Sequence, residues 1–249
     1  MHSFDLNRNK ERTLPDRVRL TIVRHGTGRF VEIVPRYPGD RPYPRVTFDT
    51  ASPLTVRDLD GDGEPEVVLD LFDSGTRCCA WIRIYRFDRA RNRYAPQNHW
   101  WGDLQATYRR VGHGLRDLDG DGRPEFIAAD DRFGQLSYWA IDPIQIWSYD
   151  RGRFLDVTRR FPRLISADAR ANWRFYVDVL KQGGPQREAL AAWMADEYLL
   201  GHASNANHVL ALALQRGELG QRPDAYEPNP RIWIAKLKAL LRRAGYTRA

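Results

Sequence analysis

The sequence predicts an α+β protein, in which a blade-like antiparallel β unit (incomplete or small and propeller-like) precedes a C-terminal helical region. Short alternating segments and turn residues dominate the chain up to about residue 162, and apolar residues at helical spacing dominate after it. Strands followed by helices, without regular alternation, are typical of α+β chains. We therefore expect a flexible N-terminal arm over residues 1–16, a β domain over 17–162 and a helical region over 163–249.

The β domain is predicted to begin with a hairpin over residues 17–35. Val18, Leu20 and Ile22 alternate along its first strand, and Gly26-Thr27-Gly28 supplies a turn before a second apolar run. Residues 35–52 contain four prolines and no helical period, which predicts a loop with short extended pieces. Further strands are predicted at 66–72, 80–87, 125–129, 144–149 and 154–157, the last two joined by a tight turn over 150–153.

Four helices are predicted after Pro162. The first is expected to start at an N-cap on Ser166 and to stop at Gly183-Gly184, and Pro185 can occupy the first turn of a second helix that ends near Gly201. A third fits residues 205–216. Pro230 opens a fourth, which Gly245 ends. One face of this last helix carries the apolar residues Trp233, Leu237, Leu240 and Leu241.

Length and composition exclude several classes of protein. The chain has 249 residues, enough to bury a substantial core, and its 29 aromatic residues argue against disorder. It contains no run of eighteen apolar residues, so we expect no membrane span. The first ten residues contain no apolar h-region and do not resemble a signal peptide. Cys78 and Cys79 are adjacent, which rules out a long-range disulfide framework and leaves two ordinary thiols or a vicinal disulfide.

The net charge of +7 hides two strongly acidic segments. Residues 57–70 contain six acidic residues and one base, and residues 116–131 contain six acidic residues and two bases. The basic residues are dispersed and form no nucleic-acid-binding motif, so the pattern argues against nucleic acid as the partner.

These acidic segments belong to an internal repeat. Residues 56–68 read VRDLDGDGEPEVV and residues 115–127 read LRDLDGDGRPEFI, with the first aspartates 59 residues apart. Identity this dense at a fixed spacing indicates a duplicated supersecondary unit.

The spacing within the repeat predicts two Ca²⁺ sites. Oxygen ligands at alternate positions, with glycines that permit a sharp turn, are what Ca²⁺ coordination requires. Side-chain ligands are expected at positions 1, 3, 5 and 9 of each loop, and a backbone carbonyl at position 7. The predicted sets are Asp58, Asp60, Asp62, Glu64 and Glu66, and Asp117, Asp119, Asp121, Arg123 and Glu125, where Glu64 and Arg123 contribute the carbonyl. The alternatives are solvated turns without metal, and a calcium ion that only stabilises the loop.

An EF-hand is disfavoured because position 12, which should be a bidentate Glu, is Leu69 in one copy and Ala128 in the other. The segment after each loop is β-like rather than helical. The sequence instead resembles the FG-GAP/VCBS repeat family over residues 56–70 and 115–130, and in this respect an uncharacterised bacterial VCBS repeat-containing protein. The resemblance implies calcium loops between adjacent strands of β-propeller blades, with side-chain ligands at positions 1, 3, 5 and 9, and it implies secretion. Two marked repeats are fewer than a closed propeller needs, which favours an open unit.

Together these features predict a calcium-binding extracytoplasmic protein, extracellular or periplasmic, that serves as a binding or structural module. One alternative is a secreted hydrolase that uses carboxylates near an aromatic cleft, and another is an assembly module that pairs blades between chains as an oligomer. A carbohydrate or protein ligand is a further alternative, because exposed aromatic side chains can stack against ligands. The two aromatic groups are Trp81, Tyr85, His99, Trp100 and Trp101, and Tyr138 and Trp139. No catalytic motif appears, and the catalytic residues stay unassigned.

Overall fold

The computed structural model describes residues 2–5, 19–25, 30–36, 54–72, 80–91, 93–102, 115–137, 139–183, 187–220, 227 and 229–247. The chain divides into two compact units. One comprises residues 1–126 and 148–155, and the other comprises 127–147 and 156–249. Residues 127–147 and 156–162, which the sequence places in the β domain, thus group with the helices, and the boundary at residue 162 stays a prediction.

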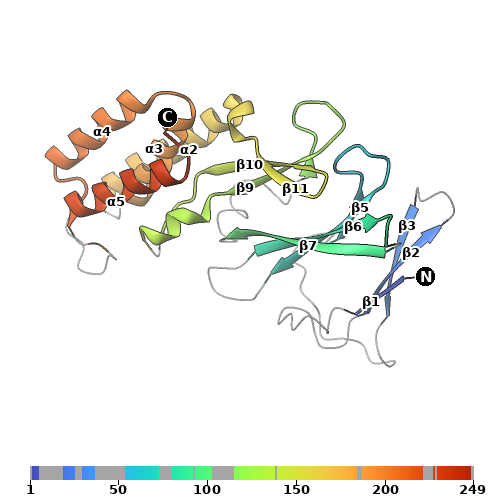
Figure 1. Ribbon diagram of the computed structural model, residues 1–249. Coiled ribbons are helices and arrows are strands. Elements are labelled where there is room, and N and C mark those ends of the chain that lie inside the picture. Colours follow the sequence, from blue (N-terminus) through green and yellow to red (C-terminus); the bar gives the residue numbers. More distant parts are fainter. Residues whose placement is uncertain are drawn as a thin grey trace. The chain divides into compact units, whose positions relative to one another are not determined.

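The first sheet has the strand order β1-β2-β3 (Figure 1). Its strands are β1 His2–Asp5, β2 Arg19–His25 and β3 Phe30–Arg36. Antiparallel pairing of Ile22 with Ile33 in β2 and β3 confirms the predicted hairpin. Strand β1 lies in the segment predicted to be a flexible arm and pairs with β2.

The second sheet has the order β4-β5-β6-β7 and is antiparallel throughout. Its strands are β4 Leu54–Arg57, β5 Glu66–Phe72, β6 Ala80–Asp88 and β7 Arg93–Gly102. Consecutive residues of β5 and β6, among them Val67, Val68 and Ile84, are buried, so both faces of these central strands are covered. The strands predicted at 66–72 and 80–87 are confirmed.

The third sheet has the order β11-β10-β9-β8. Its strands are β8 Leu115–Arg116, β9 Glu125–Ala129, β10 Ile144–Asp150 and β11 Arg153–Asp156. Arg151 and Gly152 both have positive φ, which is the geometry of a two-residue hairpin turn that matches the twist of the strands. The described strands form open sheets and close into no barrel or propeller, in agreement with the expected open unit.

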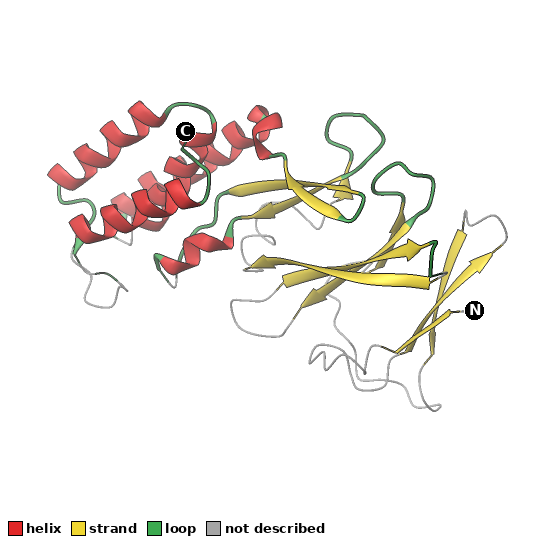
Figure 2. Ribbon diagram, viewed as in Figure 1, coloured by secondary structure: helices red, strands yellow, loops and turns green. Residues whose placement is uncertain are grey.

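The C-terminal part of the chain is helical, which confirms the α+β class (Figure 2). The helices are the short 3₁₀ segments η2 Asp131–Gln135 and η3 Thr158–Arg160, followed by α2 Pro162–Lys181, α3 Arg187–Leu199, α4 Ala203–Gln215 and α5 Pro230–Arg243. The N-cap predicted at Ser166 is wrong, because α2 already begins at Pro162, whose fixed φ suits the first helical position. Pro230 does open α5, where Asn229 is the N-cap.

The core of the helical unit forms around α3, which is buried along almost its whole length. The face predicted for the last helix is confirmed, since Trp233, Leu237, Leu240 and Leu241 are all buried in this core. In the described part of the chain, every helix is too short or too polar to cross a lipid bilayer.

Candidate metal centre

The two acidic loops occupy equivalent places in two β hairpins. The first loop, residues 58–65, joins β4 to β5, and the second loop, residues 117–124, joins β8 to β9 (Figure 1). Both hairpins pair antiparallel, and each loop's position 9 is the first residue of the returning strand. The predicted link between each loop and a following strand is therefore confirmed.

The first loop is organised by its own backbone amides. Asp58 accepts hydrogen bonds from the N–H groups of Gly61 at 2.8 Å and Gly63 at 2.9 Å, one on each carboxylate oxygen. Asp60 Oδ1 accepts from the N–H of Asp62 at 3.3 Å. Asp62 Oδ1 accepts in turn from the N–H two residues further along the loop at 2.9 Å. These bonds fix the orientation of the carboxylates at positions 1, 3 and 5 of the loop.

The carboxylate at position 9 closes this loop from the strand. Glu66 Oε2 accepts a hydrogen bond from the N–H of Leu59 at 3.0 Å. Gly63, at position 6, has φ +82°, a left-handed conformation that favours glycine, and its N–H faces Asp58. Glycine at this position therefore permits the sharp turn that ligands at alternate loop positions require.

The second loop repeats the same hydrogen bonds. Asp117 accepts from the N–H groups of Gly120 and Gly122 at 2.8 and 2.9 Å. Asp119 Oδ1 accepts from the N–H of Asp121 at 3.3 Å, and Asp121 Oδ1 accepts from the N–H of Arg123 at 2.8 Å. Glu125 Oε2 accepts from the N–H of Leu118 at 2.9 Å. Two segments 59 residues apart therefore fold into one loop geometry.

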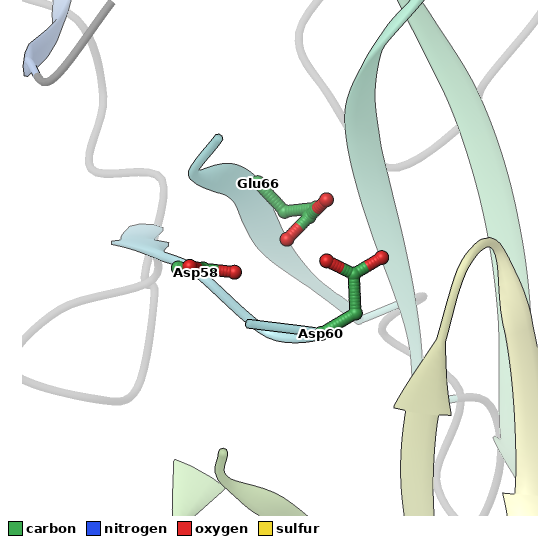
Figure 3. Close-up of side chains that lie close together, drawn as sticks. All are labelled: Asp58, Asp60 and Glu66. Carbon is green, nitrogen blue, oxygen red and sulfur yellow. The ribbon is translucent and has the colours of Figure 1, made fainter. Parts of the chain in front are cut away.

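In each loop, three carboxylates converge closely enough to share one cation. The groups are Asp58, Asp60 and Glu66, and Asp117, Asp119 and Glu125, and within each group the candidate ligand oxygens lie within 4.8 Å of one another. Figure 3 shows the first group, in which the carboxylates of Asp60 and Glu66 point toward each other. The structure thus brings together positions 1, 3 and 9 of both predicted sets.

The remaining predicted ligands lie outside these groups. Asp62 and Asp121, at position 5, are in the same loops but are not among the converging carboxylates. Glu64 and Arg123, at position 7, were expected to contribute a backbone carbonyl, and that role stays a prediction. The donor set is composed of oxygen atoms, which suits a hard cation such as Ca²⁺.

Burial distinguishes the two groups. Asp60 is 8% exposed and Glu66 is 1% exposed, whereas Asp117 and Asp119 are exposed and only Glu125 of the second group is buried. Burial raises the pKa of Glu66 to about 7, since the charged carboxylate loses its hydration; Asp60 and Asp62 raise the pKa further, and the N–H of Leu59 and Arg86 oppose the shift. The first loop thus contains negative charge that water stabilises poorly.

Two residues from distant segments complete the surroundings of the first loop. Arg86 of β6 directs its guanidinium to three carboxylates: Nη2 lies 2.9 Å from Asp62 and 3.3 Å from Asp60, and Nε lies 3.5 Å from Glu66. Arg151, in the turn between β10 and β11, donates its backbone N–H to Asp60 Oδ2 at 3.0 Å. The motif contained no signal for either partner.

The two loops are neighbours in the same unit. A Cβ added at Gly61 of the first loop would lie 3.3 Å from Cδ of Arg123 in the second loop. The guanidinium of Arg123 pairs with Asp121 at 2.8 Å. The side chain at position 7 of the second loop therefore lies against the first loop.

The other predicted site residues form no second centre in the described residues. Tyr85 is buried in the sheet, and His99 stacks on Phe154 with ring centroids 4.0 Å apart. Trp139 is 58% exposed. The side chains of Trp81, Trp100 and Trp101, and residues Cys78, Cys79 and Tyr138, lie outside what the structure describes.

The helical unit contains a cavity of about 340 Å³. Arg132, Arg159, Arg160 and Tyr246 contribute to its lining. Asp156 is the single carboxylate among the described residues that line it, and it accepts hydrogen bonds from Thr158. The cavity therefore does not bring together the carboxylate pair that the hydrolase alternative requires.

Comparison with known proteins gives a distant relative. No protein-family model and no solved structure matches the chain. A protein described as a probable thylakoid lumen protein, from the cyanobacterium Synechocystis sp., is 24% identical over 154 residues, which is 59% of this chain. The match spans 44% of that relative, so the chain corresponds to less than half of the relative's length.

Proposed function

We propose that this protein binds two Ca²⁺ ions, one in each acidic loop, and that it is a binding or structural module with FG-GAP/VCBS-like repeats. The observation that carries the proposal is the duplicated geometry. Three carboxylates converge within 4.8 Å in both loops, on matching sets of backbone hydrogen bonds.

The electrostatics of the first loop support a cation there. Glu66 is almost fully buried beside the carboxylates of Asp60 and Asp62, and burial and this repulsion together raise its pKa to about 7. A divalent cation offsets both effects. Ca²⁺ suits the loops better than Mg²⁺, because it accepts six to eight oxygen ligands in flexible geometry, whereas Mg²⁺ demands a near-ideal octahedron.

We also propose that the protein works outside the cytoplasm, in an extracellular or periplasmic compartment. Millimolar calcium, which weak loop sites of extracellular modules require, is typical of such compartments. The distant relative carries the description of a lumen protein, which is compatible with this placement. In this setting, bound calcium stabilises the folded loops because it binds the folded chain and not the unfolded one.

Calorimetric titration with CaCl₂ tests the proposal. We expect two ions per chain for the unaltered protein, one for Asp60→Asn, one for Asp119→Asn, and none for the double variant. Asp88→Asn is the control, because Asp88 lies outside both loops and pairs with Arg91 at 3.0 Å. Binding of two ions by the double variant, or of none by the unaltered protein, would refute the proposal.

A further inference from the structure

Resting on the proposed calcium sites, we propose that Arg86 is a tethered cation that competes with Ca²⁺ for the first loop and thereby sets the calcium affinity of that site. Arg86 lies outside the loop motif and reaches the loop from strand β6.

Arg86 contacts the carboxylate oxygens that the loop amides leave for a cation. In Asp60 and Asp62, Oδ1 accepts a loop N–H and Oδ2 faces Arg86; Asp60 Oδ2 also accepts the N–H of Arg151. In Glu66, Oε2 accepts a backbone N–H and Oε1 faces the arginine. The guanidinium thus contacts carboxylate oxygens that accept no N–H of the loop itself.

Asp60 and Glu66 belong to the converging group, so Arg86 contacts two of its three carboxylates. A guanidinium and a Ca²⁺ ion at these oxygens would repel each other across a partly buried space, where charges are weakly screened. Calcium binding is therefore expected to require that the arginine withdraw.

The surroundings permit that withdrawal. The side chain of Arg86 is 35% exposed, in contrast to 0% for Asp60 and 1% for Glu66. Its long stem arises from β6, a strand next to the one that carries Glu66, so it can turn toward water while the carboxylates stay in place. The backbone N–H of Arg151 can still hydrogen-bond Asp60 when the side chain of Arg86 has turned toward water.

Arg86 also explains how the loop can be folded before calcium binds. A single guanidinium partly compensates the buried carboxylates, but its one charge is less than that of the divalent ion. Removal of Arg86 should therefore have opposite effects in the two states: the calcium-free loop loses its counter-charge, and the calcium site loses its competitor.

Calorimetric titration of the first loop alone tests the inference. The second loop is silenced by Asp117→Asn with Asp119→Asn, and Arg86→Gln is compared with Arg91→Gln in that background. Arg91 is a matched control, because it lies in the β6–β7 turn, pairs with Asp88 at 3.0 Å, and its replacement changes the net charge equally. We expect Kd for Ca²⁺ to fall at least about tenfold in Arg86→Gln and less than about threefold in Arg91→Gln.

Thermal unfolding gives a second test. If Arg86 acted only as a structural ion pair, Arg86→Gln would lower Tm equally with and without Ca²⁺. Arg86→Gln should lower Tm in chelator, and excess Ca²⁺ should abolish or reverse that difference. Arg86→Lys keeps a charge without the planar fork, so its Kd should lie between those of the unaltered residue and Arg86→Gln.

An unchanged or raised Kd in Arg86→Gln overturns the inference while leaving the proposed function standing. The same holds if Arg86→Gln lowers Tm equally with and without Ca²⁺, or if it stays unfolded in both. If neither loop of the unaltered protein nor any Arg86 variant binds Ca²⁺, the proposed function itself fails.

Discussion

Removing calcium should lower the thermal stability of the protein by an amount that the calcium affinity of the two loops determines. A ligand that binds only the folded chain stabilises it by RT ln(1 + [L]/Kd). For extracellular modules with Kd near 0.1–1 mM, about 10 mM Ca²⁺ would contribute roughly 1.4–2.7 kcal/mol per site. Two independent sites would contribute roughly 3–5 kcal/mol.

This free energy corresponds to a large shift in melting temperature. For a chain of this size, each kcal/mol moves Tm by about 2–4 °C, so the shift between excess Ca²⁺ and chelator should be roughly 6–20 °C. Scanning calorimetry or circular dichroism at matched ionic strength would measure it. Matched ionic strength matters because the carboxylates at positions 1 and 3 of the second loop are exposed and are screened by salt.

Alanine variants assign the shift to the loops. Asp60→Ala and Asp119→Ala should each remove about half of the shift, and the double variant should remove all of it. Asp88→Ala, which changes an aspartate in the β6–β7 hairpin outside both loops, should keep the full shift. No shift in the unaltered protein, or an equal shift in the double variant, would refute the assignment of calcium to these carboxylates.

Three further predictions concern single side chains. Burial lowers the pKa of His99 to about 4, so the stability that its neutral ring contributes is present above pH 6.5 and is lost as the pH falls toward 4. His99→Phe keeps the ring contact with Phe154 but cannot be protonated. In this variant, the loss of unfolding free energy between pH 6.5 and 4, measured in urea, should be smaller by up to about 3 kcal/mol. Asn229→Ala removes the acceptor for two N–H groups at the start of α5 and should cost about 1 kcal/mol in the same assay. Gly61→Ala should cost about 1–2 kcal/mol because Gly61 has φ +74°, whereas Gly134→Ala, with no neighbour within 4 Å of the added Cβ, should be nearly neutral; equal costs would contradict this reasoning.

Local sequence patterns predicted the elements that depend on local chemistry. The hairpin over 17–35 and the turn over 150–153 were identified because alternation and turn residues act within a few positions. The start of α2 was missed although Pro162 carried a usable signal, since proline is favoured at the first helical position. Ser166 satisfied the side-chain preference of an N-cap but lies inside the helix, which shows that a capping residue alone does not locate a helix start.

The candidate site was predictable only in part, for a physical reason. The carboxylates at positions 1 and 3 are placed by the loop's own amides, so their convergence follows from spacing. Arg86 is 24 residues from Asp62, and Arg151 is 91 residues from Asp60. These contacts depend on how the strands pair and where the β10–β11 turn lies, and no local pattern encodes that information.

The two loops are alike in backbone geometry but differ in their surroundings, and this difference bears on their roles. The D-L-D-G-D-G-x-P-E sequence produces the same amide-to-carboxylate bonds in both copies. Asp60 is nevertheless buried while its counterpart Asp119 is exposed. In the first loop, Ca²⁺ would have to displace the guanidinium of Arg86 from the buried carboxylates. In the second loop, Ca²⁺ would displace only water from the exposed Asp117 and Asp119. The two copies of the motif should therefore bind Ca²⁺ with different affinities, and residues outside the motif set the difference.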